Sequence, residues 1–195
     1  MLFPVRVGLD DKRIFDEMDK AAQLMTELPP DRAAGDMSGA IDWLLANGTG
    51  AGVGVVGFCM GGSLSIWSGT LSPDVSACVA FYPGASWERH APNWANFRGK
   101  HAQIHCAEGD GTSAAPVIQE ASREIEAAGG QCTLFDYPGT GHAFFNDDRP
   151  EVYNADAAHD GDLGADVDGA AADVDVAVVQ RLQHLRQGKA VGDQL

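Results

Sequence analysis

The chain has 195 residues, of which 45% are hydrophobic, so it is long enough for one domain with a buried core. Its 28 acidic residues outnumber its 13 lysines and arginines, and the formal net charge of −15 argues against nucleic acid or an anionic membrane as a partner. No apolar run is long enough for a transmembrane helix, and the N-terminus lacks the apolar stretch of a signal peptide, so we expect a cytoplasmic protein.

The N-terminal region has the pattern of two helices. Apolar residues recur at spacings of three and four from Asp10 to about Glu27, which predicts a first helix. Pro29-Pro30 ends it, and a second helix is expected from about Pro30 to Asn47-Gly48.

The middle of the chain alternates between short β-branched strands and helices. This alternation is typical of a parallel sheet that is covered by helices on both faces. Residues 85–100 are predicted to form a loop or a short helix. We expect strands at 53–58, 75–82, 102–107 and 131–137, with helices from 61 to about 69 and at 114–128.

The region after Pro150 has a less regular pattern. Residues 154–175 are rich in Asp, Gly and Ala, and they are predicted to form a solvated loop or acidic insertion. Residues 176–187 carry apolar side chains on one helical face and are expected to form a closing helix. We interpret residues 1–195 as a single domain.

The most informative motif is Gly57-Phe58-Cys59-Met60-Gly61, which follows the predicted strand 53–58. It has the G-x-nucleophile-x-G pattern of a nucleophile elbow, in which a reactive side chain sits on a sharp turn between a strand and a helix. Such a turn brings neighbouring backbones close together, and glycine leaves room for them. The N-terminus of the following helix would favour the thiolate of Cys59, which is the reactive form.

A cysteine nucleophile needs a base, and the base needs a group that orients it. In α/β-hydrolases these follow in the order nucleophile, acid, histidine, each on a loop after a strand. Asp110 and His142 occupy such places in this chain, after the strands 102–107 and 131–137. Glu108 is the fallback acid, although it lies nearer to its strand.

Cys78, Cys106 and Cys132 lie in apolar, strand-like stretches and are interpreted as buried structural residues. None of the four cysteines has C-x-x-C spacing, so we expect no zinc site. A thiol redox protein is a further interpretation, because a cysteine with a low pKa is also oxidisable. No second cysteine lies close to Cys59 in sequence, which disfavours it.

The chain resembles the dienelactone hydrolase family of the α/β-hydrolase fold over roughly residues 1–155. Weaker similarity lies at residues 39–43. The resemblance rests on Gly57 through Gly62, Ala80-Phe81-Tyr82-Pro83-Gly84, the turn at Asp110, Tyr137-Pro138-Gly139, and Gly141-His142-Ala143-Phe144-Phe145-Asn146-Asp147-Asp148.

This resemblance implies a hydrolase that opens enol-lactones or cleaves related small esters without a metal or cofactor. Cys59 would attack the carbonyl to form an acyl-enzyme, His142 would activate water, and Asp110 would hold the imidazole. The backbone N–H of Met60 would donate to the oxyanion. Arg6 is a weak match to one of the arginines that bind the substrate carboxylate in the family's lactone hydrolases.

Two departures from the family pattern bear on activity. The family normally has further strands before the region matched here, and one of their loops carries a second oxyanion donor. We therefore expect an N-terminally truncated α/β-hydrolase fold with an exposed sheet edge. The position four residues after the histidine, an arginine in the lactone hydrolases, is Asn146. The alternative interpretation is accordingly a degenerate family member with little catalysis that acts as a binding module.

Overall fold

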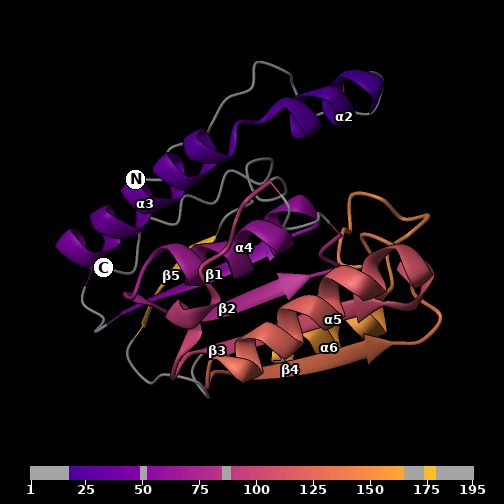
Figure 1. Ribbon diagram of the computed structural model, residues 1–195. Coiled ribbons are helices and arrows are strands. Elements are labelled where there is room, and N and C mark those ends of the chain that lie inside the picture. The colour runs from indigo at the N-terminus through magenta and orange to yellow at the C-terminus, as the bar shows by residue number, and fades with distance from the viewer. Residues whose placement is uncertain (1–17, 49–51, 85–88, 165–173, 179–195) are drawn as a thin grey trace.

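The computed structural model of the protein describes residues 18–48, 52–84, 89–164 and 174–178 (Figure 1). Two helices precede the sheet, α2 (Met18–Glu27) and α3 (Pro30–Asn47), and Pro29 at the junction has an extended backbone. Both helices were expected at these places, although residues 10–17 lie outside the described part of the chain. The guanidinium of Arg89 donates hydrogen bonds to the carbonyl oxygens of Thr26 and Leu28, and so fixes the end of α2 to a later segment.

The sheet is parallel, as predicted, and its strand order is β4-β3-β2-β1-β5. The strands are β1 (Gly52–Phe58), β2 (Val75–Phe81), β3 (His101–Ala107), β4 (Gln131–Tyr137) and β5 (Val174–Val178). The first four agree with the expected strands to within one residue at either end. Because the strands are parallel, the loops after β1 to β4 all begin on the same side of the sheet, at the carboxyl ends of the strands.

Helices connect these strands. Two α-helices, α4 (Met60–Leu71) and α5 (Gly111–Ala127), follow β1 and β3, and α5 begins three residues earlier than expected. Two short 3₁₀ helices also lie between strands: η1 (Trp94–Phe97) is in the region expected to be a loop or short helix, and η2 (Glu108–Asp110) is between β3 and α5. Residues 85–88 are outside the described chain.

The prediction of a solvated loop over residues 154–175 is wrong for residues 155–164, while residues 165–173 lie outside the described chain. Helix α6 (Ala155–Gly164) occupies its first part, and Ala157 and Ala158 are buried. The Asp-rich composition suggested a solvated segment, but the small alanines and Gly161 let this helix pack closely. A Cβ atom at Gly161 would lie 3.0 Å from the ring of Phe81.

The expected closing helix over 176–187 is also wrong where it can be compared with the structure. Residues 176–178 belong to strand β5, and residues 179–187 lie outside the described chain. Strand β5 pairs in parallel with β1, from Gly52 opposite Val174 to Val56 opposite Val178. The strand that leads to Cys59 therefore has a neighbour on each side.

Hydrophobic side chains pack on both faces of the sheet because successive residues of a strand point to opposite faces. In β2, Cys78 and Ala80 belong to one cluster, which includes residues of α3, α4 and α5. Val79 and Phe81 belong to the other, which includes Ala157 of α6. Helices thus cover both faces, as expected for an α/β-hydrolase fold.

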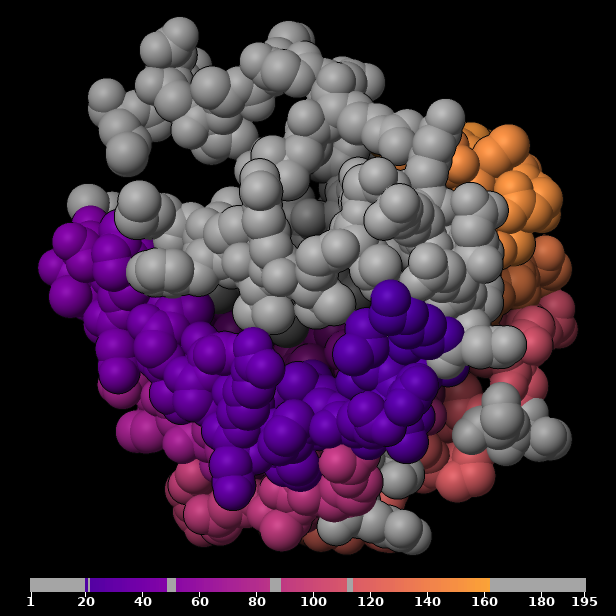
Figure 2. Space-filling view, turned by 90° about the horizontal axis from the view of Figure 1, so that it is seen from above, coloured from indigo at the N-terminus to yellow at the C-terminus, as the bar shows by residue number. Residues whose placement is uncertain are grey.

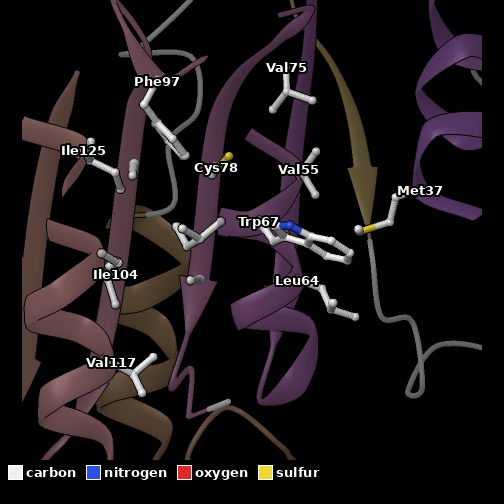
Figure 3. Close-up of a cluster of buried hydrophobic side chains, with 14 of the residues drawn as sticks. Met37, Val55, Leu64, Trp67, Val75, Cys78, Phe97, Ile104, Val117 and Ile125 are labelled. Carbon is white, nitrogen blue, oxygen red and sulfur yellow. The ribbon is translucent and has the colours of Figure 1, made fainter. Parts of the chain in front are cut away.

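The larger cluster anchors α4, the helix that begins beside Cys59. Figure 3 shows Trp67 and Leu64 of this helix beside Val55 of β1, with Met37 of α3 pointing toward them. Helices α2 and α3 form a broad indigo and purple surface on one face of the molecule (Figure 2). Among the described residues, no helix is both long and apolar enough to cross a membrane.

Candidate functional site

Cys59 lies at the junction between β1 and α4, in the conformation that a nucleophile elbow requires. Its backbone has φ 55° and ψ −121°, in a region that side-chain-bearing residues rarely adopt. The turn is held from both directions, because the Cys59 N–H donates to the Phe81 carbonyl at 3.0 Å and its own carbonyl accepts from the Gly62 N–H at 3.0 Å.

Gly57 and Gly62, on either side of Cys59, are required because other parts of the backbone pass too close to them for a side chain. A Cβ atom at Gly57 would lie 1.9 Å from the carbonyl oxygen of Gly61. A Cβ atom at Gly62 would lie 2.8 Å from the carbonyl oxygen of Phe81 on the neighbouring strand. The G-x-C-x-G-G sequence is therefore the one that lets β1, β2 and α4 meet at this turn.

The N-terminus of α4 contacts the sulfur of Cys59, because the backbone N–H of Met60 donates a hydrogen bond to it. Burial of the thiol would raise its pKa, but the hydrogen bond and positive charge of His142, together with the Met60 N–H, outweigh burial and lower the pKa of Cys59. The thiolate is thus favoured relative to an ordinary cysteine.

The pKa values of the other three cysteines are shifted in the opposite direction, upward. All four are free, and burial raises the pKa of both Cys78 and Cys106 to about 12. Burial also raises the pKa of Cys132. Cys59 is therefore the one cysteine of the chain whose environment stabilises the thiolate.

Asp110 and His142 come together at the ends of β3 and β4. The Nδ1 atom of His142 lies 2.9 Å from Oδ1 and 3.0 Å from Oδ2 of Asp110. The Asp110 side chain is 14% exposed, whereas that of His142 is 43% exposed. A carboxylate at Nδ1 fixes the ring orientation and leaves Nε2 for chemistry, which is the geometry of a base and its orienting acid.

His142 also reaches Cys59, and the two form a hydrogen bond. This bond is the largest contribution that raises the pKa of His142, to about 9, and the bond from Asp110 adds to it against the opposing effect of burial. A lowered pKa of Cys59 beside a raised pKa of His142 favours a thiolate–imidazolium pair at neutral pH.

Tyr82 is a site residue that the sequence argument did not single out. Its ring packs edge-on against the His142 ring, with centroids 5.1 Å apart, and against Phe144 at 5.3 Å. The residue is 4% exposed and has φ 39°, and its N–H donates to the carbonyl of His105 at 2.7 Å. Burial and the nearby Cys59 and Asp110 raise the pKa of Tyr82, so the phenol stays neutral. The position of Tyr82 at the end of a predicted strand, before Pro83-Gly84, was the sequence feature that could have identified it as a site residue.

Two further residues had been named from the sequence. Glu108, the fallback acid, points its carboxylate at the backbone N–H of Gly139, 2.7 Å away, while Asp110 contacts His142. Arg6 lies outside the described residues. Asn146, four residues after His142, accepts a hydrogen bond from the Asp148 N–H through Oδ1 at 3.1 Å. Within the described ranges, no group of three or more His, Cys, Asp or Glu side chains could hold a metal ion.

Comparison with known proteins gives a family match. The model of the dienelactone hydrolase family matches residues 9–163. A protein of Methylorubrum extorquens, provisionally named carboxymethylenebutenolidase, is 30% identical over 150 residues, which cover 72% of this chain and 50% of that protein. The chain thus spans about half the length of this curated relative.

Solved structures show a similar fold. A provisionally named dienelactone hydrolase from Klebsiella pneumoniae has a TM-score of 0.61 at 21% identity, over 80% of this chain and 65% of its own. A dienelactone hydrolase-like promiscuous phosphotriesterase from metagenomic libraries also has a TM-score of 0.61, at 15% identity over 75% and 63% of the two chains. An esterase from Thermogutta terrifontis has a TM-score of 0.53 at 19% identity, over 72% and 64%. At these identities the likeness establishes the fold.

Proposed function

The chain belongs to the dienelactone hydrolase family, and from this premise we propose that it hydrolyses a small carboxylic ester or lactone through a Cys59 acyl-enzyme. One observation carries the proposal: His142 contacts the Cys59 sulfur and the Asp110 carboxylate at the same time. That arrangement combines a nucleophile, a proton carrier and an orienting acid.

In the acylation step the Cys59 thiolate attacks the substrate carbonyl carbon and forms a tetrahedral intermediate. The Met60 N–H, which donates to the Cys59 sulfur, belongs to the residue directly after the nucleophile and would donate to the new oxyanion. When the intermediate collapses, the C–O bond of the ester breaks. The His142 imidazolium gives its proton to the leaving alkoxide, so a thioester and a neutral imidazole remain.

In the deacylation step the neutral His142 accepts a proton from a water molecule, which attacks the thioester carbonyl. The carboxylic acid leaves, and the thiolate–imidazolium pair forms again. Asp110 keeps Nδ1 of the imidazole oriented through both steps, so that Nε2 faces the reacting atoms. The two half-reactions together consume one water molecule and leave the protein unchanged.

For the substrate class, we propose an ester or lactone without a free carboxylate near the scissile bond. The family's lactone hydrolases bind such a carboxylate with arginines, and the side chain at the matching position here is that of Asn146, which carries no charge. The formal net charge of −15 also disfavours an anionic substrate.

The second candidate is a binding module with little catalysis. The observation that favours it is Asn146, an uncharged side chain at the position where the family's lactone hydrolases carry a substrate-binding arginine.

The test is to follow the acyl-enzyme directly. The protein is mixed with excess p-nitrophenyl acetate, quenched in acid and analysed by intact mass and peptide mapping. We expect one acetyl group on Cys59, formed together with a burst of p-nitrophenol, and its loss in both Cys59→Ala and His142→Ala. Cys106→Ala is the matched control and should acylate like the wild type. If Cys59 reacts no faster than Cys106, or equally fast without His142, the binding module is the better description.

A further inference from the structure

Two separate loops carry the two ends of the Asp110–His142 contact. Asp110 ends η2, directly after β3, and His142 lies in the turn region after β4. The two strands are parallel neighbours, and their last pair is Ala107 opposite Tyr137. Beyond that pair the sheet no longer sets the distance between the loops. The spacing of Asp110 and His142 therefore depends on contacts between the loops themselves.

Two hydrogen bonds join these loops, and neither involves Asp110 or His142. The Gly139 N–H donates to Oε2 of Glu108 at 2.7 Å. The Gly109 N–H donates to the carbonyl oxygen of Thr140 at 2.8 Å. The residue pairs that form these bonds lie one to three positions before Asp110 and His142, so they act on the loops close to the site.

The two loops also approach each other too closely at Gly109 for any side chain to fit there. A Cβ atom at Gly109 would lie 2.9 Å from the carbonyl oxygen of Thr140 and 3.0 Å from Cα of Gly141. Thr140 is buried, and its hydroxyl donates to the Tyr137 carbonyl at 2.7 Å, so the His142 loop is fixed to the end of β4. The carboxylate of Glu108 makes the second contact to this fixed loop, through the Gly139 N–H.

We propose that Glu108 is a positioning residue, which sets the distance between Asp110 and His142 by accepting the hydrogen bond from Gly139. This role rests on the proposed function, because it matters only if His142 acts on Cys59. Glu108 touches neither the sulfur nor the imidazole, so it is not a catalytic residue. Its side chain is exposed, and removing it leaves both hydrophobic clusters intact.

The experiment compares Glu108→Ala with Glu108→Gln. Both variants remove the same negative charge, but glutamine keeps a carbonyl oxygen that can accept from Gly139, and alanine does not. Glu126→Ala, which removes an exposed carboxylate from α5, is the matched control. Each protein is measured in three ways: the rate of Cys59 alkylation by iodoacetamide against pH, kcat and KM for p-nitrophenyl acetate, and Tm.

We expect Glu108→Ala to lower kcat about tenfold with KM within about twofold of the wild type, the size of a lost charge-assisted hydrogen bond that acts in the transition state. The alkylation curve should move to higher pH, because a misplaced His142 stabilises the thiolate less. Glu108→Gln should restore most of kcat and the wild-type alkylation curve. Glu126→Ala should match the wild type in all three measurements.

Three results would overturn the proposal. Wild-type kcat and alkylation in Glu108→Ala would show that the contact does not position His142. Equal losses in the alanine and glutamine variants would assign the effect to charge. A lower Tm with unchanged kcat would make Glu108 a stability residue only. The proposed function fails by a separate result. If Cys59 of the wild type is alkylated at the same rate as Cys59 of His142→Ala, His142 does not activate Cys59, whatever the Glu108 variants show.

Discussion

Asp110 faces the imidazole of His142 with both oxygens of its carboxylate, at nearly equal distances of 2.9 and 3.0 Å from Nδ1. Such a contact fixes the plane of the ring and keeps the proton on Nδ1 whenever the ring is neutral. The hydrogen-bonding capacity of Nε2 is then directed to the Cys59 sulfur, with which His142 forms its second contact. The following predictions depend on this geometry and on the packing that supports it.

Asp110→Asn should reduce kcat by about 100- to 10 000-fold, because an amide next to Nδ1 allows the wrong imidazole tautomer; the upper figure is the known size of this effect in serine proteases. The variant should fold normally, since the side chain keeps its size. The measurement is kcat with an activated ester, together with the circular dichroism spectrum. The exposed Asp148→Asn is a suitable control, and a kcat for Asp110→Asn within twofold of the wild type would contradict the prediction.

Acylation should be confined to a pH window set by Cys59 and His142. On the acid side the rate falls because the Cys59 thiolate becomes protonated. This fall occurs at a lower pH than for an ordinary thiol, because the pKa of Cys59 is lowered. At the alkaline side the rate should fall as pH rises through about 9, where His142 loses the proton that the leaving group needs. Single-turnover acylation of the wild type from pH 5 to 10 measures both limbs. A rate that keeps rising up to pH 10 would argue against the imidazolium as proton donor.

The same raised pKa links His142 to stability. The folded state binds the His142 proton more tightly than the unfolded state does. Protonated His142 therefore adds to the folding stability in full below about pH 6.5, and this stabilisation disappears as the pH rises through about 9. Chemical denaturation of wild type and His142→Gln at pH 6, 8 and 10 would test it. The difference in unfolding free energy between the two proteins should shrink with increasing pH.

His105 is predicted to make the protein sensitive to acid. The residue is fully buried, its ring stacks between Phe81 and Phe135 with centroids 4.3 and 4.8 Å away, and its Nδ1 lies 2.8 Å from the Tyr137 hydroxyl. Burial lowers the pKa of His105 to about 4. Between pH 6.5 and 4 the unfolded state therefore binds more protons, and the stabilisation present above pH 6.5 is lost as pH falls toward 4.

To test this prediction, urea unfolding of the wild type is compared with His105→Gln between pH 7 and 5, where most carboxylates remain ionised. The unfolding free energy of the wild type should fall with decreasing pH more steeply than that of the variant. His159→Gln, at an exposed histidine, should keep the wild-type slope. Parallel curves for wild type and His105→Gln would show that His105 does not titrate in this range.

Gly57→Ala should destabilise the protein by about 3 kcal/mol or more, because its Cβ would meet the backbone of Gly61 rather than a movable side chain. The effect should be much larger than that of an ordinary surface change. Gly39→Ala in α3 is the matched control. Nothing lies within 4 Å of a Cβ there, so this variant should gain up to about 1 kcal/mol from better helix propensity. Urea unfolding of both variants measures the two effects.

The strands and helices from α3 to β4 could be predicted because their signals are local. Apolar periodicity, Pro29-Pro30 and the glycines around Cys59 each specify the structure within a few residues of themselves. The order of Cys59, Asp110 and His142 after β1, β3 and β4 was equally visible, since the carboxyl ends of parallel strands lie on the same side of the sheet. Their mutual distances depend on loop contacts, which a linear pattern does not contain.

The C-terminal part was predicted poorly for a different reason. Composition dominated the interpretation of residues 154–175, although Val174-Asp175-Val176-Ala177-Val178 alternates with the period of a strand. The partner of that strand lies far away in the sequence, at Gly52–Val56. The role of Glu108 was missed similarly, because a carboxylate two residues from the acid resembles a second acid candidate until its contact with Gly139 is known.

The pairing of β5 with β1 also affects how the protein is made. During synthesis, β1 and the elbow leave the ribosome long before residues 174–178 do, so the nascent chain carries β1 without one of its two neighbours. An unpaired parallel strand edge can associate with other incomplete chains. Chaperone dependence and the yield of soluble protein should therefore respond to changes in β5, although Cys59, Asp110 and His142 all lie on other parts of the chain.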